Sequence, residues 1–482
     1  MNKKQIGYII SCLLVLFVAV NTYVIANESY WTLLIPFALA IIFLAIFRVY
    51  SLLTFVAFLT PLSTSLGELG LYNPLGVEMS LPTEPLLFGL MIIAWVKMFS
   101  YIGLYRGLYL HPISWCIAIY IYWIFFTSLS SSMPLVSFKL FVTRMWFVSS
   151  FYVLAYSSFQ DRQKVHVFVK CYLFGLSIVA IYTLIQHAIM GFEHDAAHWV
   201  MSPFFKDHTS YGMSLALIFP FAIYLYRWSE TFNQKLVFGF CLLLILIAII
   251  FSYTRAAWLS LIAATVVYIF IKLRVRFSVL FASVILVVSF LFVFQTEILV
   301  VLEKNSQDSS DSFIEHFESI SNVSTDASNL ERINRWKSAI RLFRERPHLG
   351  WGIGTYQFNY APYQNYYDKT IISTNSGNKG NAHSEYFSIL AETGWPGLLI
   401  FIVFLVVLFT RAIGLYGKLA DKKDKALIMT CILSLVTYFS HAVLNNFLDM
   451  DKASVPLWGF ISVIVMMDVK ERSKLENKKR RI

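Results

Sequence analysis

Residues 393–410 read TGWPGLLIFIVFLVVLFT, a stretch without a single charged side chain. A bilayer core takes about 20 apolar residues per helix, because backbone groups in lipid must hydrogen-bond within their own segment. Uncharged runs of this size recur at Ile6–Asn27, Ser29–Phe47, Val49–Gly67, Cys171–Phe192, His208–Tyr226, Phe277–Thr296 and Ala426–Leu448. We therefore predict an all-α polytopic membrane protein.

The remaining apolar runs supply further spans. Those long enough for one helix are Pro85–Tyr105, Leu140–Gln160 and Ala453–Met467. The run Gly107–Phe138 is too long for one span and is broken by Ser130–Pro134, and Arg255 interrupts a second overlong run. These divisions predict about 12 to 14 transmembrane helices. Because no cleavage site follows the first run, we expect it to be a retained helix.

The composition excludes several other classes of protein. Of the 482 residues, 58% are hydrophobic and only 14% are charged, whereas about a quarter are charged in soluble domains. The five cysteines lie inside apolar runs, where Cys acts as a small hydrophobic residue, so they indicate neither a disulfide scaffold nor a redox compartment.

The basic residues set the predicted topology, since Lys and Arg favour cytoplasmic connections. They fall mostly on alternate connections, at Lys3-Lys4, Arg48, Lys97 with Arg106, Arg162 with Lys164, Arg227 with Lys235, Lys272–Arg276, Lys418–Lys425 and Lys470–Arg481. We expect both termini to be cytoplasmic. Most of the net charge of +11 then lies on cytoplasmic connections and sets the orientation in the membrane. It therefore does not indicate nucleic acid as a partner.

One connection is far longer than a minimal bundle needs. We divide the chain into an N-terminal transmembrane bundle (1–296), a large external loop with catalytic elements (297–392), and C-terminal transmembrane helices with a basic cytoplasmic tail (393–482). Long loops in compact folds are usually functional. This loop changes from acidic over 297–326 to basic over 332–346.

The basic part of the loop carries the signals of a helix. Ser328 and Glu331 form a capping box, and Pro347 and Gly350 end the helix. The residues expected to form its packed apolar face are Ile333, Trp336, Ile340 and Phe343. The arginines have two interpretations: a solvated face paired with the acids at 297–326, or a clamp for a diphosphate, which suits the guanidinium fork.

A glycine segment and a histidine follow this helix. Gly350-x-Gly352-x-Gly354 superficially resembles a dinucleotide loop, but neither a strand before it nor a helix after it supports that interpretation. His383 lies a few residues before a span and after the arginine helix, outside the predicted bilayer.

The ordered set of motifs resembles the O-antigen ligase and polymerase superfamily. Its pieces are Arg332-x-x-x-Trp336, Pro347-x-x-Gly350-x-Gly352-x-Gly354, His383-x-x-Tyr386 and Glu392-x-Gly394-x-x-Gly397, after an upstream arginine motif at Ser252–Leu259. The resemblance covers about residues 205–465, and it departs at Ser384, where members commonly have Asn.

The resemblance implies an inverting, metal-independent glycosyltransferase of the large membrane-embedded, GT-C-like type, without a cofactor. The implied partners are a glycan on undecaprenyl diphosphate, a glycan or lipid-core acceptor, and the bilayer of a bacterial inner membrane, with the loop in the periplasm. Arg255, Arg332 and His383 match the family's functional residues. We add Arg335 by helical adjacency and Tyr386 from the histidine motif as substrate-binding candidates.

Two basic residues after Pro134 come from the sequence alone. Lys139 and Arg144 lie within a predicted span, and a charge there is costly unless it faces a cavity or a partner. Both are candidates for binding the lipid diphosphate. A bond from Arg144 to a carbonyl of a neighbouring helix explains it equally well.

The strongest sequence argument for a metal is the pair Asp449-x-Asp451, a spacing that binds divalent ions in nucleotide-sugar enzymes. Lys452 follows directly, and arginine elsewhere can replace a cation, so we expect a structural or acceptor-side role. We expect the nearby His441 to be a buried, hydrogen-bonded residue.

Three functions remain open at this stage. A ligase joins a finished glycan to a lipid A-core sugar or another acceptor, and a polymerase joins one repeat unit to another. We favour the ligase. A transporter or flippase for lipid-linked sugars is a weaker alternative, because we find no paired halves with broken helices.

Overall fold

The computed structural model describes residues 3–28, 30–70, 79–275, 327–369 and 380–479, with the single residues 279, 282 and 373. The predicted span Phe277–Thr296, except for Val279 and Ala282, and the acidic segment 297–326 lie outside the described residues. Two compact units are present, Met1–Leu53 and Thr54–Ile482. This division differs from the one expected from the sequence, which stays a prediction.

The first unit consists of apolar helices. Helix α1 (Lys3–Ala26) and helix α2 (Ile35–Phe47), with the 3₁₀ turn Trp31–Leu34 before α2, occupy the first two predicted spans. Helix α3 (Val49–Leu59) leads into the second unit.

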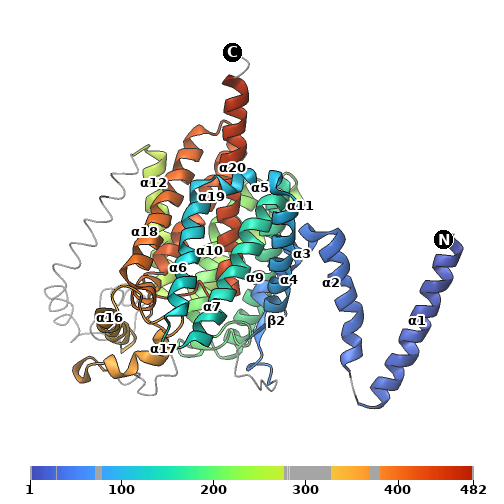
Figure 1. The fold of residues 1–482 in the computed structure, drawn as a ribbon, viewed down its shortest axis with the longest axis horizontal. Helices are drawn as coiled ribbons and strands as arrows, with labels where there is room; N and C mark the ends of the chain where they lie inside the picture. Colours follow the sequence, from blue (N-terminus) through green and yellow to red (C-terminus); the bar gives the residue numbers. More distant parts are fainter. Residues whose placement is uncertain are drawn as a thin grey trace. The chain divides into compact units, whose positions relative to one another are not determined.

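The second unit is a helical bundle (Figure 1). Its main helices are α4 (Thr83–Ser100), α6 (Pro112–Leu129), α7 (Pro134–Phe147), α9 (Arg162–Ile189), α10 (His208–Arg227), α11 (Phe232–Phe251), α12 (Arg255–Lys272), α18 (Glu385–Lys418), α19 (Lys422–His441) and α20 (Asp451–Lys479). The other helical elements are α5 (Ile102–Tyr109), a π-helical turn (Val148–Leu154) with α8 (Ala155–Ser158) that continues α7, α16 (Ala327–Glu345) and α17 (Tyr356–Asn359). Strands β1 (Thr64–Ser65) and β2 (Ser80–Leu81) form one antiparallel pair.

The predicted fold class is confirmed. In the part of the chain that the structure describes, nine helices are long and apolar enough to cross a membrane. Both overlong runs divide where the sequence indicated. Helix α6 ends at Leu129 and α7 begins at Pro134, whose missing N–H suits a first helical turn. Helix α12 begins at Arg255.

Helix α20 forms the centre of the bundle. Every residue from Asp451 to Asp468 is buried, although the segment was predicted only from its apolar composition. Helices α10, α12 and α19 pack against one another beside it. The core is therefore held by helix packing and not by propensity alone.

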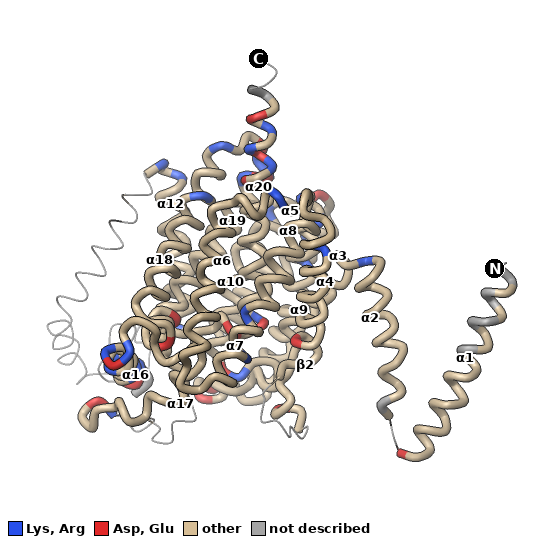
Figure 2. Tube along the Cα trace, in the orientation of Figure 1, with Lys and Arg blue, Asp and Glu red and all other residues tan. Residues whose placement is uncertain are grey.

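The two ends of this bundle differ. Helices α16 and α17 lie at one end, called here the loop end, and the last turns of α20 project from the other, the tail end (Figure 1). Figure 2 shows Lys and Arg gathered at the tail end, with a second group on α16. The cytoplasmic position expected for the tail end stays a prediction.

The orientation predicts a labelling pattern in a cysteine-free background. Tyr367→Cys, at an exposed position near α17, should react with an impermeant thiol reagent once the outer barrier is permeabilised, and Lys422→Cys should react only after lysis. The reverse pattern would invert the topology.

Candidate functional site

Helix α16 packs with a face that the sequence did not predict. Its buried side chains are largely polar: Glu331, Asn334, Arg335, Ser338, Ala339 and Leu342. The apolar residues of the expected face are only partly buried. The helix itself is confirmed, but the choice of packed face was wrong, because hydrogen bonds with the rest of the loop satisfy the polar stripe.

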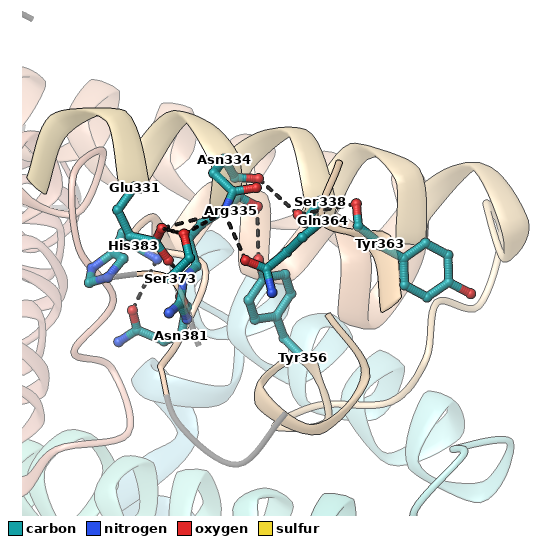
Figure 3. A network of polar contacts seen from close by, with 10 residues as sticks. All are labelled: Glu331, Asn334, Arg335, Ser338, Tyr356, Tyr363, Gln364, Ser373, Asn381 and His383. Atoms are coloured by element: carbon teal, nitrogen blue, oxygen red, sulfur yellow. Dashed lines mark hydrogen bonds and ion pairs between the residues drawn. The ribbon is translucent and has the colours of Figure 1, made fainter. Parts of the chain in front are cut away.

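An ion pair lies at the centre of this face, as Figure 3 shows. Nε of Arg335 donates to Oε1 of Glu331 over 2.6 Å, and the two side chains are only 5% and 4% exposed. Glu331 also accepts hydrogen bonds from Ser373 and Asn334. Burial alone raises the pKa of Glu331, but the hydrogen bonds from Ser373 and Arg335 outweigh it, so the pKa lies below its ordinary value.

The same arginine holds the segment before α18. A terminal nitrogen of Arg335 donates to the carbonyl of Asn381 over 3.3 Å, and its guanidinium lies 4.3 Å from the ring centre of Tyr360. A Cβ atom added at Gly380 would lie only 2.1 Å from a terminal nitrogen of Arg335, so the guanidinium packs directly against this glycine. These contacts make Arg335 a residue that positions the loop. Its expected contact with substrate stays a prediction that this geometry does not favour.

His383 lies directly beside this pair. Its backbone N–H donates to Oδ1 of Asn381 over 3.0 Å, and its carbonyl accepts from Nε1 of Trp336 over 3.2 Å. Its φ of 47° is uncommon for a residue with a side chain, so the surrounding contacts must hold it. Burial, with the charges of Arg332 and Arg335, lowers the pKa of His383 to about 4. The imidazole is therefore neutral near pH 7.

The departure from the family pattern at Ser384 has a local explanation. Ser384 is the N-cap of α18, and its hydroxyl accepts from the backbone N–H of Phe387. Asn and Ser are both favoured at N-caps. Ser384 thus preserves the cap of α18.

The charge of Arg332 acts on three histidines from different elements. They are His383 before α18, His208 at the start of α10, and His441 at the end of α19. The carboxylate of Asp207 acts on His383 and His441 as well. The loop end of the bundle therefore presents one arginine and several imidazoles to a common region.

Arg255 approaches the same end of the bundle. It is the first residue of α12, where the positive end of the helix dipole adds to its charge. The preceding Thr254 donates to the carbonyl of His208 over 2.8 Å, which ties the starts of α12 and α10 together. The structure thus brings Arg255, Arg332 and His383 to one end of the bundle, although their roles stay predictions.

The glycine motifs are structural. Gly352 N–H donates to the carbonyl of Glu392 over 2.8 Å, and Trp395 N–H donates to that of Pro347 over 2.9 Å. A Cβ at Gly350 would lie 2.3 Å from the backbone of Glu392, and one at Gly394 would lie 2.3 Å from that of His348. The two segments interlock and hold the start of α18, which bends at Gly394 (φ 71°).

Arg144 is part of a buried network. Nε donates to Asp449 over 2.7 Å, and the terminal nitrogens donate to Tyr120 and Glu385 over 2.9 and 3.2 Å. Neither sequence interpretation anticipated these partners. The guanidinium is held by two carboxylates and a phenol instead of a helix carbonyl, and a role in binding the donor stays a prediction that this network does not favour.

The two aspartates of the Asp-x-Asp pair have different partners. Asp451 accepts from Ser63 and Thr83 over 2.6 and 2.5 Å, whereas Asp449 contacts Arg144. Among the described residues, no group of three or more metal-binding side chains is present. Both carboxylates have protein partners in this arrangement, and the structural or acceptor-side role expected for the pair stays a prediction.

Two further candidates lie elsewhere on the bundle. Lys139 is exposed on α7. The hydroxyl of Tyr386 donates to the carbonyl of Phe439 over 3.1 Å and joins α18 to α19. No described contact brings either side chain to His383.

Sequence reasoning missed Asp207 and His208 and misjudged His441. His208 opens a predicted span directly after Asp207, a capping signal that marks a helix start at the loop end. His441 is buried as expected, but no described residue hydrogen-bonds to either ring nitrogen. Only the fold shows that the charge of Arg332 acts on His208 and His441.

One family model matches part of the chain. The model described as O-antigen ligase matches residues 240–402, a range that contains Arg255, Arg332 and His383. The match confirms the resemblance to the O-antigen ligase and polymerase superfamily. A search of curated proteins finds no match.

The buried network around Arg144 predicts a large effect on stability. Arg144→Ala would leave Glu385 and Asp449 without their counter-charge, so we expect a loss of about 3–5 kcal/mol, measured by thermal unfolding in detergent. The control is Arg162→Ala, which breaks exposed pairs with Asp421 and Asp424 and should cost less than about 1 kcal/mol. Unchanged stability with lost donor binding would instead assign Arg144 to the substrate.

Proposed function

We propose that the protein is an inverting, metal-independent glycosyltransferase of the O-antigen ligase type. It transfers a glycan from undecaprenyl diphosphate to an acceptor hydroxyl on a lipid A-core sugar or another acceptor. The site faces the periplasm from a bacterial inner membrane. The observation that carries this proposal is a neutral His383 beside Arg332 within the matched O-antigen ligase domain.

The donor side of the reaction needs positive charge. As the bond between the anomeric carbon and the bridging oxygen breaks, negative charge grows on the departing lipid diphosphate. Arg332 lies on α16, and Arg255 starts α12, where the helix dipole reinforces it. We assign both arginines to the diphosphate, whose oxygens suit a bidentate guanidinium.

The acceptor side needs a group that takes or orients a proton. The acceptor oxygen forms the new bond to the anomeric carbon from the face opposite the diphosphate, which inverts that centre. Its proton passes to a ring nitrogen of His383, which is free to accept because the imidazole is neutral. The electron pair of the broken glycosyl bond leaves with the diphosphate. The negative charge that the diphosphate gains balances the positive charge of the protonated imidazole.

Metal independence follows from the same arrangement. Arginines supply the charge that a divalent ion supplies in other transferases. Asp449 and Asp451 are each engaged by protein donors. Transfer should therefore survive EDTA, and added magnesium or manganese should not increase it.

The direct test uses purified protein, lipid-linked glycan and acceptor in liposomes. Glycan transfer with release of undecaprenyl diphosphate supports the proposal, whereas movement of the lipid across the bilayer without transfer indicates a flippase. A deletion strain then separates the two transferases. Full-length chains left unattached indicate a ligase, and single repeats on the core indicate a polymerase.

We predict different defects for the two sides of the site. His383→Ala should lose about 10²–10⁴-fold in turnover and still bind donor, because base catalysis is removed. Arg332→Ala should weaken donor binding, and Lys at this position should rescue poorly because a point charge lacks the guanidinium fork. Donor affinity measured by titration decides the matter: the opposite pattern would reverse the two roles.

The pKa of His383 predicts the pH dependence. The free enzyme should lose kcat/KM only as pH falls through about 4, where the base becomes protonated. A bound diphosphate offsets the charge of Arg332 and favours the imidazolium, so the acid limb of kcat should lie at higher pH. Coincident limbs in the two profiles would contradict this coupling.

A further inference from the structure

His441 is exceptional among the buried histidines. It ends α19, it is 1% exposed, and neither Nδ1 nor Nε2 receives a hydrogen bond from any residue that the structure describes. His187 and His111 are equally buried, yet His187 contacts the carbonyl of Glu193 and His111 contacts Asp468, each over 2.9 Å. Because unpaired buried polar groups are costly, a histidine kept in this state indicates a function.

The surroundings of His441 connect it to the proposed site. The backbone N–H of Glu385 donates to the carbonyl of Ala442 over 2.9 Å, so the residue after His441 is bonded to the start of α18, two positions after His383. The ring of Phe447 lies 5.7 Å from that of His441 between centres. One side of the imidazole is therefore apolar.

The charges around His441 favour an anionic partner. Among the charged groups near His441, Arg332 has the largest effect, followed by Asp207 and His208. Asp207 is committed to its own helix, since Oδ1 accepts from Ser210 N–H over 2.8 Å and from Thr209 over 2.6 Å. An anion bound by Arg332 would offer oxygens that can accept a hydrogen bond from the imidazole N–H.

We propose that His441 is a second substrate-contacting histidine, whose ring N–H donates to a phosphate oxygen of the lipid diphosphate beside Arg332. This inference rests on the proposed function and extends it. His441 acts on the donor and His383 on the acceptor. Because His441 is covered, neighbouring side chains must move for the contact to form.

The test separates binding from stability. His441→Phe replaces the imidazole by an apolar ring of similar shape, so the melting temperature should be unchanged or higher. The affinity for undecaprenyl diphosphate, titrated in detergent micelles, should fall about 10- to 100-fold, the range for a hydrogen bond to a charged group. His441→Gln, which keeps an N–H donor, should retain more affinity than His441→Phe.

His187→Phe is the matched control, because it is equally buried but removes an existing hydrogen bond. It should melt at a lower temperature and bind the lipid diphosphate as the wild type does. If His441→Phe behaves like this control, His441 is structural and the inference is overturned. If His441→Phe does not fold, His441→Leu answers the same question.

Failure of the proposed function looks different. A wild-type protein that neither binds undecaprenyl diphosphate nor transfers glycan refutes the transferase itself. A wild-type protein that does both, with unchanged affinity in folded His441→Phe or His441→Leu, refutes only the role of His441.

Discussion

The ion pair between Glu331 and Arg335 is the interaction on which the loop end depends. A buried pair is stable only when its remaining donors and acceptors are satisfied. Here Glu331 also accepts from Ser373, and Arg335 reaches the carbonyl of Asn381. Because the Asn381 side chain holds the backbone of His383, displacing either charge would displace the histidine. Polar contacts therefore orient α16 on the bundle more than its apolar stripe does.

This arrangement lets a basic region keep a neutral histidine. Burial and the neighbouring guanidinium groups favour the unprotonated imidazole, which is the form that can accept a proton. The positive charge that suppresses protonation of His383 is the same charge that attracts an anionic leaving group. Arg332 thus serves both halves of the proposed reaction from one position, and the diphosphate that it binds changes the basicity of the acceptor-side group.

The sequence predicted the helices well and their contacts poorly. Apolar runs divided by Pro134 and Arg255 fixed most helix limits, because the bilayer constrains length and hydrogen bonding strongly. The buried face of α16 was missed because its polar residues bond to residues 25 to 46 positions away, beyond any local pattern. The partners of Arg144 were missed for the same reason: Glu385 and Asp449 reach it from distant parts of the chain. The convergence of His208 and His441 on Arg332 likewise depends on how α10 and α19 pack.

The motifs that carry the resemblance to the O-antigen ligase and polymerase superfamily have mainly architectural roles in this chain. The glycines around Gly350 and Gly394 interlock two backbone segments, and Ser384 caps α18. What remains for chemistry is a small set of charges and imidazoles at helix ends, positioned by that architecture. In the proposed function this set holds the lipid diphosphate and takes the acceptor proton, two requirements common to ligases and polymerases. The choice of acceptor would then depend on residues outside these motifs, so the same ordered motifs could serve both reactions.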